Sequence, residues 1–250
     1  MTNTLTDYNL WLVLVSFLVS LFGAGTGLLT SARIRGDDNR CHYGWLALSA
    51  VVLGGGAVWA MHFVGMLAFR PGIPMTYHTG TTMLSLALPV VFFAMGLWVT
   101  NRWPASVAAL LGAGTVLGLG IAAMHYTGMA AVRSEAVIRH DSTLTLISIV
   151  IAVVASCAAL FLLRHAQGLL RAASAPVLAV AVCGMHYTGM AAMVLRPGVT
   201  PSDYFSGAVT GPQMLMLVIL VVTLIYVASL SLVWHREMRD LRQDLALKRY

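Results

Sequence analysis

Charge is scarce in this chain of 250 residues, since only 10% are Asp, Glu, Lys or Arg whereas 59% are hydrophobic. Soluble globular domains carry about 25% charged residues, so the composition excludes an ordinary soluble fold. Basic residues outnumber acidic ones by 15 to 9, but they are spread thinly over loops and one terminal run. Loop charge of this kind is typical of membrane topology, and we expect no nucleic-acid partner.

Cysteine is also rare. The three residues, Cys41, Cys157 and Cys183, are odd in number and show no CxxC spacing. The pattern therefore gives no support for a disulfide framework.

What the chain does have is long apolar runs. A run of roughly 20 apolar residues spans the hydrocarbon core of a bilayer as a helix, and about seven such runs are too many for a signal peptide plus a soluble domain. We predict an all-α polytopic membrane protein with seven transmembrane helices. The expected helices lie near residues 9–30, 44–69, 81–100, 105–132, 143–163, 173–195 and 212–234.

The distribution of arginine and lysine sets the expected orientation. Four basic residues belong to the N-terminus and the loops after the second, fourth and sixth helices: Arg70, Arg133, Arg139 and Arg196. The other eleven lie in the alternate loops and the tail. Because cytoplasmic loops carry an excess of Lys and Arg, we predict an N-terminus outside and a C-terminus in the cytoplasm.

An internal repeat runs through the apolar segments. The sequence AMHFVGMLA at 60–68 returns as AMHYTGMAA at 123–131 and as GMHYTGMAA at 184–192. The central residues His62, His125 and His186 are 63 and 61 residues apart, the length of two helices and two loops. Each histidine precedes an arginine by eight to ten residues. Counted from that arginine at the outer end of the helix, the histidine lies on the order of 12–15 Å deeper. The three histidines are therefore expected at one depth, in the outer half of the bilayer. We therefore predict a threefold internal two-helix repeat around one axis.

The motif residues suit a soft metal ion. Positions i and i+4 share one face of a helix, whereas the methionine directly before each histidine is rotated by about 100°. Imidazole binds copper, zinc, iron and nickel, and thioether sulfur selects soft ions such as Cu(I). Glycine three residues after each histidine allows close helix approach. The face-sharing pairs are His62 with Met66, His125 with Met129, and His186 with Met190.

The structural alternative is that each histidine only hydrogen-bonds another helix. Other residues near the motifs have similar alternatives. His78 either binds or passes on a metal ion at the entrance of the site, or is a solvated loop residue. Cys183 is either a fourth metal ligand or a small buried side chain. Tyr126 and Tyr187, with Phe63 at the matching position, either support the site or pack against it.

The three copies MHFVGM, MHYTGM and MHYTGM on alternate helices resemble the bacterial MHYT-domain family over residues 9–234. The resemblance implies a sensor in the bacterial inner membrane that binds copper and senses oxygen, carbon monoxide or nitric oxide. It also implies a cytoplasmic output domain in cis, such as one for cyclic-di-GMP turnover. The residues that it implies as metal ligands are Met61, His62, Met124, His125, Met185 and His186.

The tail carries a second pattern. Trp234, Met238, Leu241 and Leu245 are spaced like the a and d positions of a coiled coil, although a helix lying on the membrane surface shows the same pattern. We divide the chain into a sensor domain over 1–234 and a linker over 235–250 toward an output domain. A second copy of the chain is a further expected partner, because Gly23 and Gly27 form a GxxxG pair.

Three other functions compete with the sensor. An intramembrane zinc hydrolase would use three histidines and a water, but it needs a carboxylate. Copper uptake needs a methionine path to the other face, and haem would use two of the histidines. The nearest acids are Asp7, Glu135, Asp141 and Asp203, none of them inside a helix beside a motif histidine. We therefore expect a sensory module and not an enzyme.

Overall fold

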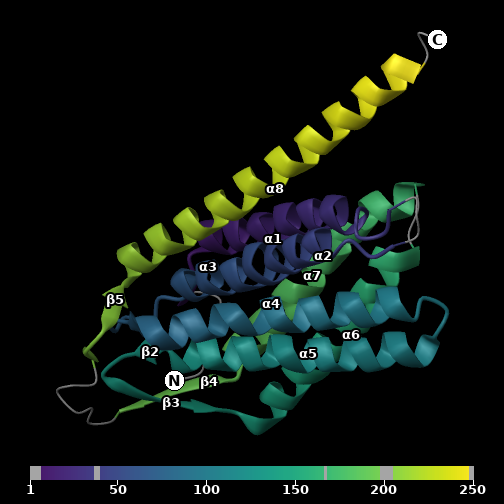
Figure 1. Ribbon diagram of the computed structural model, residues 1–250. Coiled ribbons are helices and arrows are strands. Elements are labelled where there is room, and N and C mark those ends of the chain that lie inside the picture. The colour runs from purple at the N-terminus through teal and green to yellow at the C-terminus, as the bar shows by residue number, and fades with distance from the viewer. Residues whose placement is uncertain (1–6, 37–39, 166–167, 198–204, 248–250) are drawn as a thin grey trace.

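The computed structural model describes residues 7–36, 40–165, 168–197 and 205–247. They form a bundle of long helices with short strands gathered at one end, which we call the strand end (Figure 1). The second membrane segment is divided into α2 (Tyr43–Ala50), the π-helix η2 (Val51–Trp59) and α3 (Ala60–Ala68), and we call it the first motif span. The other helices are α1 (Leu10–Ser31), α4 (Thr79–Arg102), α5 (Val107–Ala130), α6 (Ser142–His165), α7 (Gly168–Ala191) and α8 (Gly211–Leu247).

Six helical segments of the described chain are long and apolar enough to cross a membrane. They are α1, the first motif span, α4, α5, α6 and the Gly211–Gln243 part of α8. The prediction of an all-α multi-pass membrane protein is confirmed. The helix α7 is a further helix of 24 residues, and it carries the third motif copy.

The helices pack in a closed order. The first motif span lies between α1 and α4, α5 lies between α4 and α6, and α7 packs against both α6 and α1. The helix α8 stands outside this ring, against α1 and the first motif span. As a result, 89% of the apolar window of the first motif span is buried, against 17% for α8. The first motif span is the core helix of the bundle.

Polar side chains cap the N-terminal ends of several helices, just before an apolar run of the sequence begins. The side chain of Asn9 accepts hydrogen bonds from the first turn of α1, and Ser106 does the same for α5. At the strand end, His78 accepts from the amide of Thr81 at the start of α4. Such caps satisfy amides that have no partner within the helix.

The connections after the motif helices form strands, which the sequence analysis treated as loops. The three-stranded sheet joins β1 (Thr76–His78) to β2 (Val132–Arg133) and β5 (Ala208–Thr210), all antiparallel. The second sheet pairs β3 (Ala136–His140) with β4 (Met193–Pro197). Because β4 begins at Met193, α7 ends at Ala191 and not near residue 195. The sheets tie the three motif helices together at the strand end.

The first motif span also departs from the regular α-helix that we predicted. In η2 the amide of Ala60 bonds the carbonyl of Gly55, five residues back, a spacing that is rare in proteins and often found at functional sites. The segment contains Gly54, Gly55 and Gly56. A Cβ atom on Gly54 would lie 2.7 Å from the backbone of Pro89 in α4, so glycine is required there by close helix packing.

The last helix is longer than the sequence indicated. We expected the membrane span to end near residue 234 and the tail to form a coiled-coil or surface helix, and α8 continues as one helix to Leu247. It starts at the strand end and projects past the opposite end of the bundle (Figure 1). Near that end, Glu237 of α8 pairs with Arg33, just beyond the end of α1.

Candidate metal centre

The three motif histidines meet at one point inside the bundle, and we call this group the histidine triangle. His62 comes from α3, His125 from α5 and His186 from α7, and all three are fully buried. Their Nδ1 atoms face one another at 3.1 Å (His62 to His186), 3.1 Å (His125 to His62) and 3.4 Å (His186 to His125). The predicted convergence of the three histidines is therefore present in the fold.

Hydrogen bonding alone does not account for this triangle. A ring nitrogen of neutral imidazole is either a donor or an acceptor, so among three Nδ1 atoms at least two are of the same kind. At least one of the three contacts therefore sets two lone pairs, or two N–H groups, against each other. One cation at the centre removes the conflict, because it accepts all three lone pairs at once.

The other ring nitrogens point toward the motif glycines in a cyclic order. A Cβ atom built on Gly128 would lie 2.3 Å from Nε2 of His62, and one on Gly189 would lie 2.2 Å from Nε2 of His125. Likewise, Gly65 receives His186, at 2.3 Å. Each histidine thus reaches the glycine of another motif copy. The prediction that these glycines permit close approach is confirmed.

The Nε2 atoms of the triangle have no hydrogen-bond partner. A buried polar group without a partner costs roughly 1–3 kcal/mol, and here three occur together. Histidines that only join helices by hydrogen bonds would not leave this pattern, because their bonds would go to the neighbouring backbone. Metal ligation at Nδ1 would make each Nε2 an N–H donor and would not remove this cost, so the case for a ligand rests on the Nδ1 contacts.

The distances fit a first-row transition metal. With metal–nitrogen bonds of about 2.0–2.1 Å, tetrahedral ligand nitrogens lie roughly 3.3–3.4 Å apart, close to the Nδ1 separations given above. Haem does not fit, since two axial nitrogens on opposite sides of an iron lie about 4 Å apart with the macrocycle between them. The glycine contacts leave no space for that ring system.

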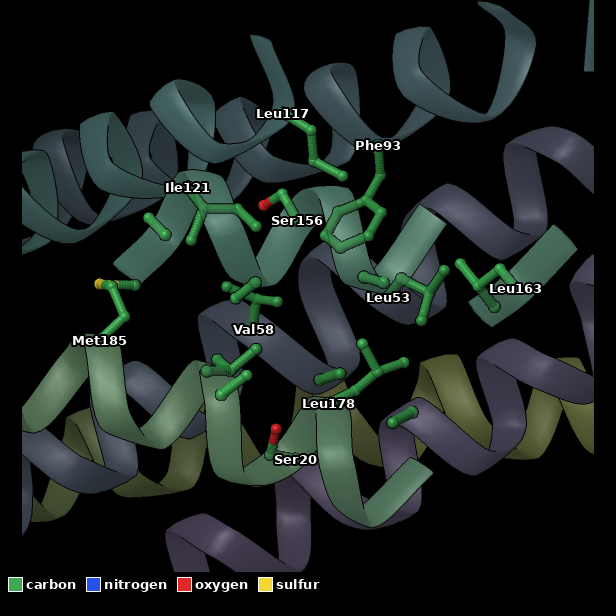
Figure 2. A pocket seen from close by; sticks show the side chains of 17 residues that line it. Ser20, Leu53, Val58, Phe93, Leu117, Ile121, Ser156, Leu163, Leu178 and Met185 are labelled. Atoms are coloured by element: carbon green, nitrogen blue, oxygen red, sulfur yellow. The ribbon is translucent and has the colours of Figure 1, made fainter. Parts of the chain in front are cut away.

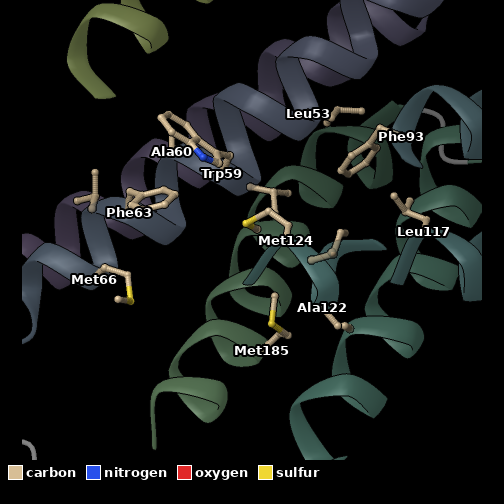
Figure 3. Close-up of a cluster of buried hydrophobic side chains, with 14 of the residues drawn as sticks. Leu53, Trp59, Ala60, Phe63, Met66, Phe93, Leu117, Ala122, Met124 and Met185 are labelled. Atoms are coloured by element: carbon tan, nitrogen blue, oxygen red, sulfur yellow. The ribbon is translucent and has the colours of Figure 1, made fainter. Parts of the chain in front are cut away.

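The six motif methionines are all in the core. Met66, Met129 and Met190, which share a helix face with the histidines, are at most 1% exposed, and so are Met61, Met124 and Met185. Figure 3 shows Met66, Met124 and Met185 among the buried hydrophobic side chains. Burial therefore does not separate the two sets, and the choice of sulfur ligand stays a prediction.

A layer of hydrogen bonds surrounds the triangle. Tyr126 on α5 bonds Ser148 on α6 at 2.6 Å, and Tyr187 on α7 bonds Ser16 on α1 at 2.8 Å. From the sequence, these tyrosines could either support the site or pack against it, and in the structure they form hydrogen bonds between helices. They fix the helices that carry the histidines.

The first copy has Phe63 in place of tyrosine, and a different residue supplies the bond. The indole Nε1 of Trp59 donates to Ser85 on α4 at 3.2 Å. Trp59 lies four residues before Phe63, on the same helix face. Sequence reasoning missed Trp59, although its spacing from the missing tyrosine was a usable signal.

The remaining candidates lie apart from the triangle. His78 shares hydrogen bonds with Thr81 and caps α4, so it has a structural role. Cys183 is not in the cluster, and neither is any carboxylate of the described chain. Asp141 caps α6 through the amide of Leu144, and Asp203 lies outside the described residues. The carboxylate that a zinc hydrolase needs is thus not provided by the part of the chain described here.

One further histidine lies next to this layer. His140 on β3 packs edge-on against Tyr126, with ring centroids 5.6 Å apart. Partial burial lowers the pKa of His140, because the charged imidazolium loses hydration. The side chain therefore adds no positive charge beside the motif helix at neutral pH.

Fold and site together define a class, a multi-pass helical membrane protein whose repeated motif builds one buried histidine cluster. The chain belongs to the MHYT family, described as "Bacterial signalling protein N terminal repeat", which matches residues 55–113, 118–175 and 180–242. This confirms the resemblance found in the sequence.

The similar proteins are signalling proteins. The chain is 43% identical over 194 residues to the bifunctional diguanylate cyclase/cyclic di-GMP phosphodiesterase MucR of Pseudomonas aeruginosa, covering 75% of this chain and 28% of that protein. It is 36% identical over 209 residues to the cyclic di-GMP phosphodiesterase NbdA of the same species (80% and 26%). It is 31% identical over 202 residues to the signaling protein YkoW of Bacillus subtilis (78% and 25%).

The chain spans about a quarter of the length of these curated relatives. It is an MHYT sensory region, and no catalytic domain is evident among its described residues. No solved structure matches it.

Proposed function

We propose that the histidine triangle binds one transition-metal ion, copper in the first place and zinc as the alternative, and that the bundle acts as a sensor. A diatomic gas (oxygen, carbon monoxide or nitric oxide) or a change of redox state alters the ligation of the metal. The observation that carries the proposal is the set of three Nδ1 atoms at 3.1–3.4 Å, which no assignment of donors and acceptors satisfies.

Copper is favoured by the donor set. Three neutral imidazoles, with buried methionines on the same helices, suit a soft or borderline ion and disfavour magnesium or calcium. In our proposal the sulfur comes from Met66, Met129 or Met190, which lie at i+4 from the histidines. The motif's name points instead to Met61, Met124 and Met185. Replacing either set by leucine distinguishes the two.

The signal would leave through α8. Seven spans with the N-terminus outside would place the far end of α8 in the cytoplasm. Tyr226 of α8 donates to the carbonyl oxygens of Val19 (3.2 Å) and Gly56 (3.0 Å), and Gly56 belongs to the π-helix six residues before His62. A shift of His62 on metal ligation would thereby reach α8. A ligand drives such a shift only through different affinities for two states.

Beyond the sensor domain over 1–234, the linker over 235–250 would join α8 to the output domain. Trp234, Met238, Leu241 and Leu245 are spaced along one face of α8, which supports a coiled coil with a second copy of the chain. By analogy with MucR and NbdA, we propose cyclic-di-GMP turnover as the output, in the bacterial cytoplasmic membrane.

Metal analysis tests the proposal. Anaerobically purified protein should contain about one first-row transition metal per chain, and His125→Ala/His186→Ala should lose it. The matched control is His78→Ala, because His78 caps α4 outside the triangle, and it should keep the metal. A folded wild-type protein without metal, or an unchanged metal content in the double variant, would contradict the proposal.

A further inference from the structure

A polar hollow opens at the end of the bundle opposite the strand end, where α4 ends and α2 begins (Figure 1). Its volume is about 200 Å³, whereas one water molecule needs roughly 10–15 Å³, so a phosphate group fits. We call it the arginine hollow. Its lining residues are Arg35, Cys41, Tyr43, Trp98, Asn101 and Arg102.

Two arginines from different parts of the chain converge on this hollow. Arg35 lies in the connection between α1 and α2, which a β-bridge to Cys41 holds in place. Its guanidinium donates to the carbonyl oxygen of Asn101 near the end of α4. Arg102 is the last residue of α4, and its guanidinium lies 5.5 Å from the centre of the Trp103 ring. No carboxylate of the described chain is among the lining residues, so an anion would meet only cationic and neutral side chains.

The ordinary reasons for basic residues at this end explain why the arginines are present but not why they converge. Cytoplasmic loops collect arginine, and the helix dipole stabilises a cation at the C-terminal end of a helix. That dipole contributes about −0.5 charge at the end of α4, but α2 begins at Tyr43 on the same hollow and contributes about +0.5. The dipoles offset each other, so the guanidinium groups make the hollow positive.

Aromatic side chains around the hollow indicate its depth in the membrane. Tyr43, Trp98 and Trp103 are exposed, and the two tryptophan rings pack edge to face with centroids 5.8 Å apart. Tryptophan and tyrosine gather at the level of the lipid headgroups. The exposed side chains of Met95 and Val91 precede Trp98 by three and seven residues on the same face of α4. A lipid with its headgroup in the hollow would cover this face with an acyl chain.

The interior of the bundle offers a contrast. The cavity in Figure 2 is lined almost entirely by hydrophobic side chains, such as Leu53, Val58 and Phe93, and none of its described lining residues is charged. The arginine hollow selects its ligand by charge and geometry, because a guanidinium binds two phosphate oxygens through parallel N–H groups.

We propose that the arginine hollow binds the phosphate group of an anionic phospholipid in the adjacent leaflet, which is the cytoplasmic leaflet in the orientation predicted from the loop charges. Basic pockets between transmembrane helices on that side bind lipid headgroups. Arg35 and Arg102 bind the phosphate oxygens, and Tyr43 and Trp98 bring a hydroxyl and an indole N–H to the same hollow. The lipid site is separate from the metal centre, since none of its residues belongs to a motif copy.

Lipid binding to the purified full chain in detergent tests the assignment. Native mass spectrometry should show phosphatidylglycerol bound saturably at one site, about tenfold or more tightly than the zwitterionic phosphatidylcholine. Each arginine beside an anionic lipid contributes about a fivefold change in affinity, so Arg35→Gln/Arg102→Gln should lower the affinity roughly 25-fold. Arg236→Gln/Arg242→Gln removes the same two charges from exposed positions of α8 and should change it less than about twofold, because exposed charges are screened by salt.

Arg102→Gln alone tests the site even where the double variant folds poorly, because this side chain is exposed at the end of α4. It should lose about fivefold in affinity, and Arg102→Lys should keep most of the wild-type affinity. Equal affinities for the two lipids, or an equal loss in the α8 variant, would overturn the proposal. Binding of inorganic phosphate that is lost in Arg35→Gln/Arg102→Gln, without any preference between the lipids, would assign the hollow to a soluble anion instead.

Discussion

In the second and third motif copies, a tyrosine next to the histidine bonds a serine on the neighbouring helix, whereas the first copy uses a tryptophan one turn earlier. The three serines are otherwise alike, because Ser16, Ser85 and Ser148 each donate to the carbonyl three residues back. What the three copies share is therefore a serine that receives one ring donor from the motif helix, and not the phenol itself.

The first copy differs in a second way. Among the motif helices as the structure describes them, only that of the first copy contains a π-segment. Tyr226 of α8 packs against this segment: a Cβ atom on Gly56 would lie 2.9 Å from the Tyr226 ring. The helices α5 and α7 are regular. The neighbours of α5 are α4 and α6, and those of α7 are α6 and α1. The deviations from the repeat thus concentrate where the ring of helices meets α8, while the triangle keeps the same pattern in all copies.

The largest loss of metal affinity is expected from changes at the motif glycines, which all three copies share. Gly128→Ala would place a Cβ atom 2.3 Å from Nε2 of His62 and push that ring out of the triangle. Overpacking of this kind costs about 1–3 kcal/mol of stability, and displacing a ligand through its support costs about 10–100-fold in metal affinity. Metal titration and thermal unfolding in nanodiscs measure both.

Gly112→Ala is the matched control on α5, since nothing lies within 4 Å of the added atom. Alanine there should keep the metal affinity and leave stability unchanged or slightly higher. If Gly65→Ala and Gly189→Ala behave like Gly112→Ala, the cyclic packing of the triangle is wrong.

A smaller effect is expected where the copies differ. Trp59→Phe removes the donor to Ser85 and leaves unfilled space, and adding Phe63→Tyr makes the first copy resemble the others. The double variant should be more stable than Trp59→Phe by about 0.6 kcal/mol, and at most about 1.7, the range for hydrogen bonds between membrane helices. Tyr126→Phe should lose a similar amount.

Unfolding by denaturant in mixed micelles compares these variants. A Phe63→Tyr change that further destabilises Trp59→Phe would show that the tyrosine and tryptophan positions are not equivalent.

Much of the candidate site could be predicted from the sequence. The spacing of His62, His125 and His186 predicted one shared depth, and the glycines predicted close approach, because both follow from helical periodicity. The contact of each Nε2 with the glycine of another copy was not predictable, since it depends on how the three helices are rotated about their axes. The strands were missed because segments of two to five residues carry little periodic signal.

Two further features depend on tertiary packing. The π-helix arises where Gly54 meets the backbone of Pro89 and Gly56 meets Tyr226, contacts between segments far apart in the sequence. The face of α6 that turns inward is also set by packing, because α6 is apolar all around and its hydropathy does not reveal that face.

X-ray absorption at the metal K-edge of the purified, anaerobic wild-type protein tests the central claim most directly. We predict a first shell with three imidazole nitrogens at about 2.0 Å and the multiple scattering of histidine rings. A shell without imidazole scattering, or one that stays unchanged in His62→Ala, would contradict a metal held by the histidine triangle.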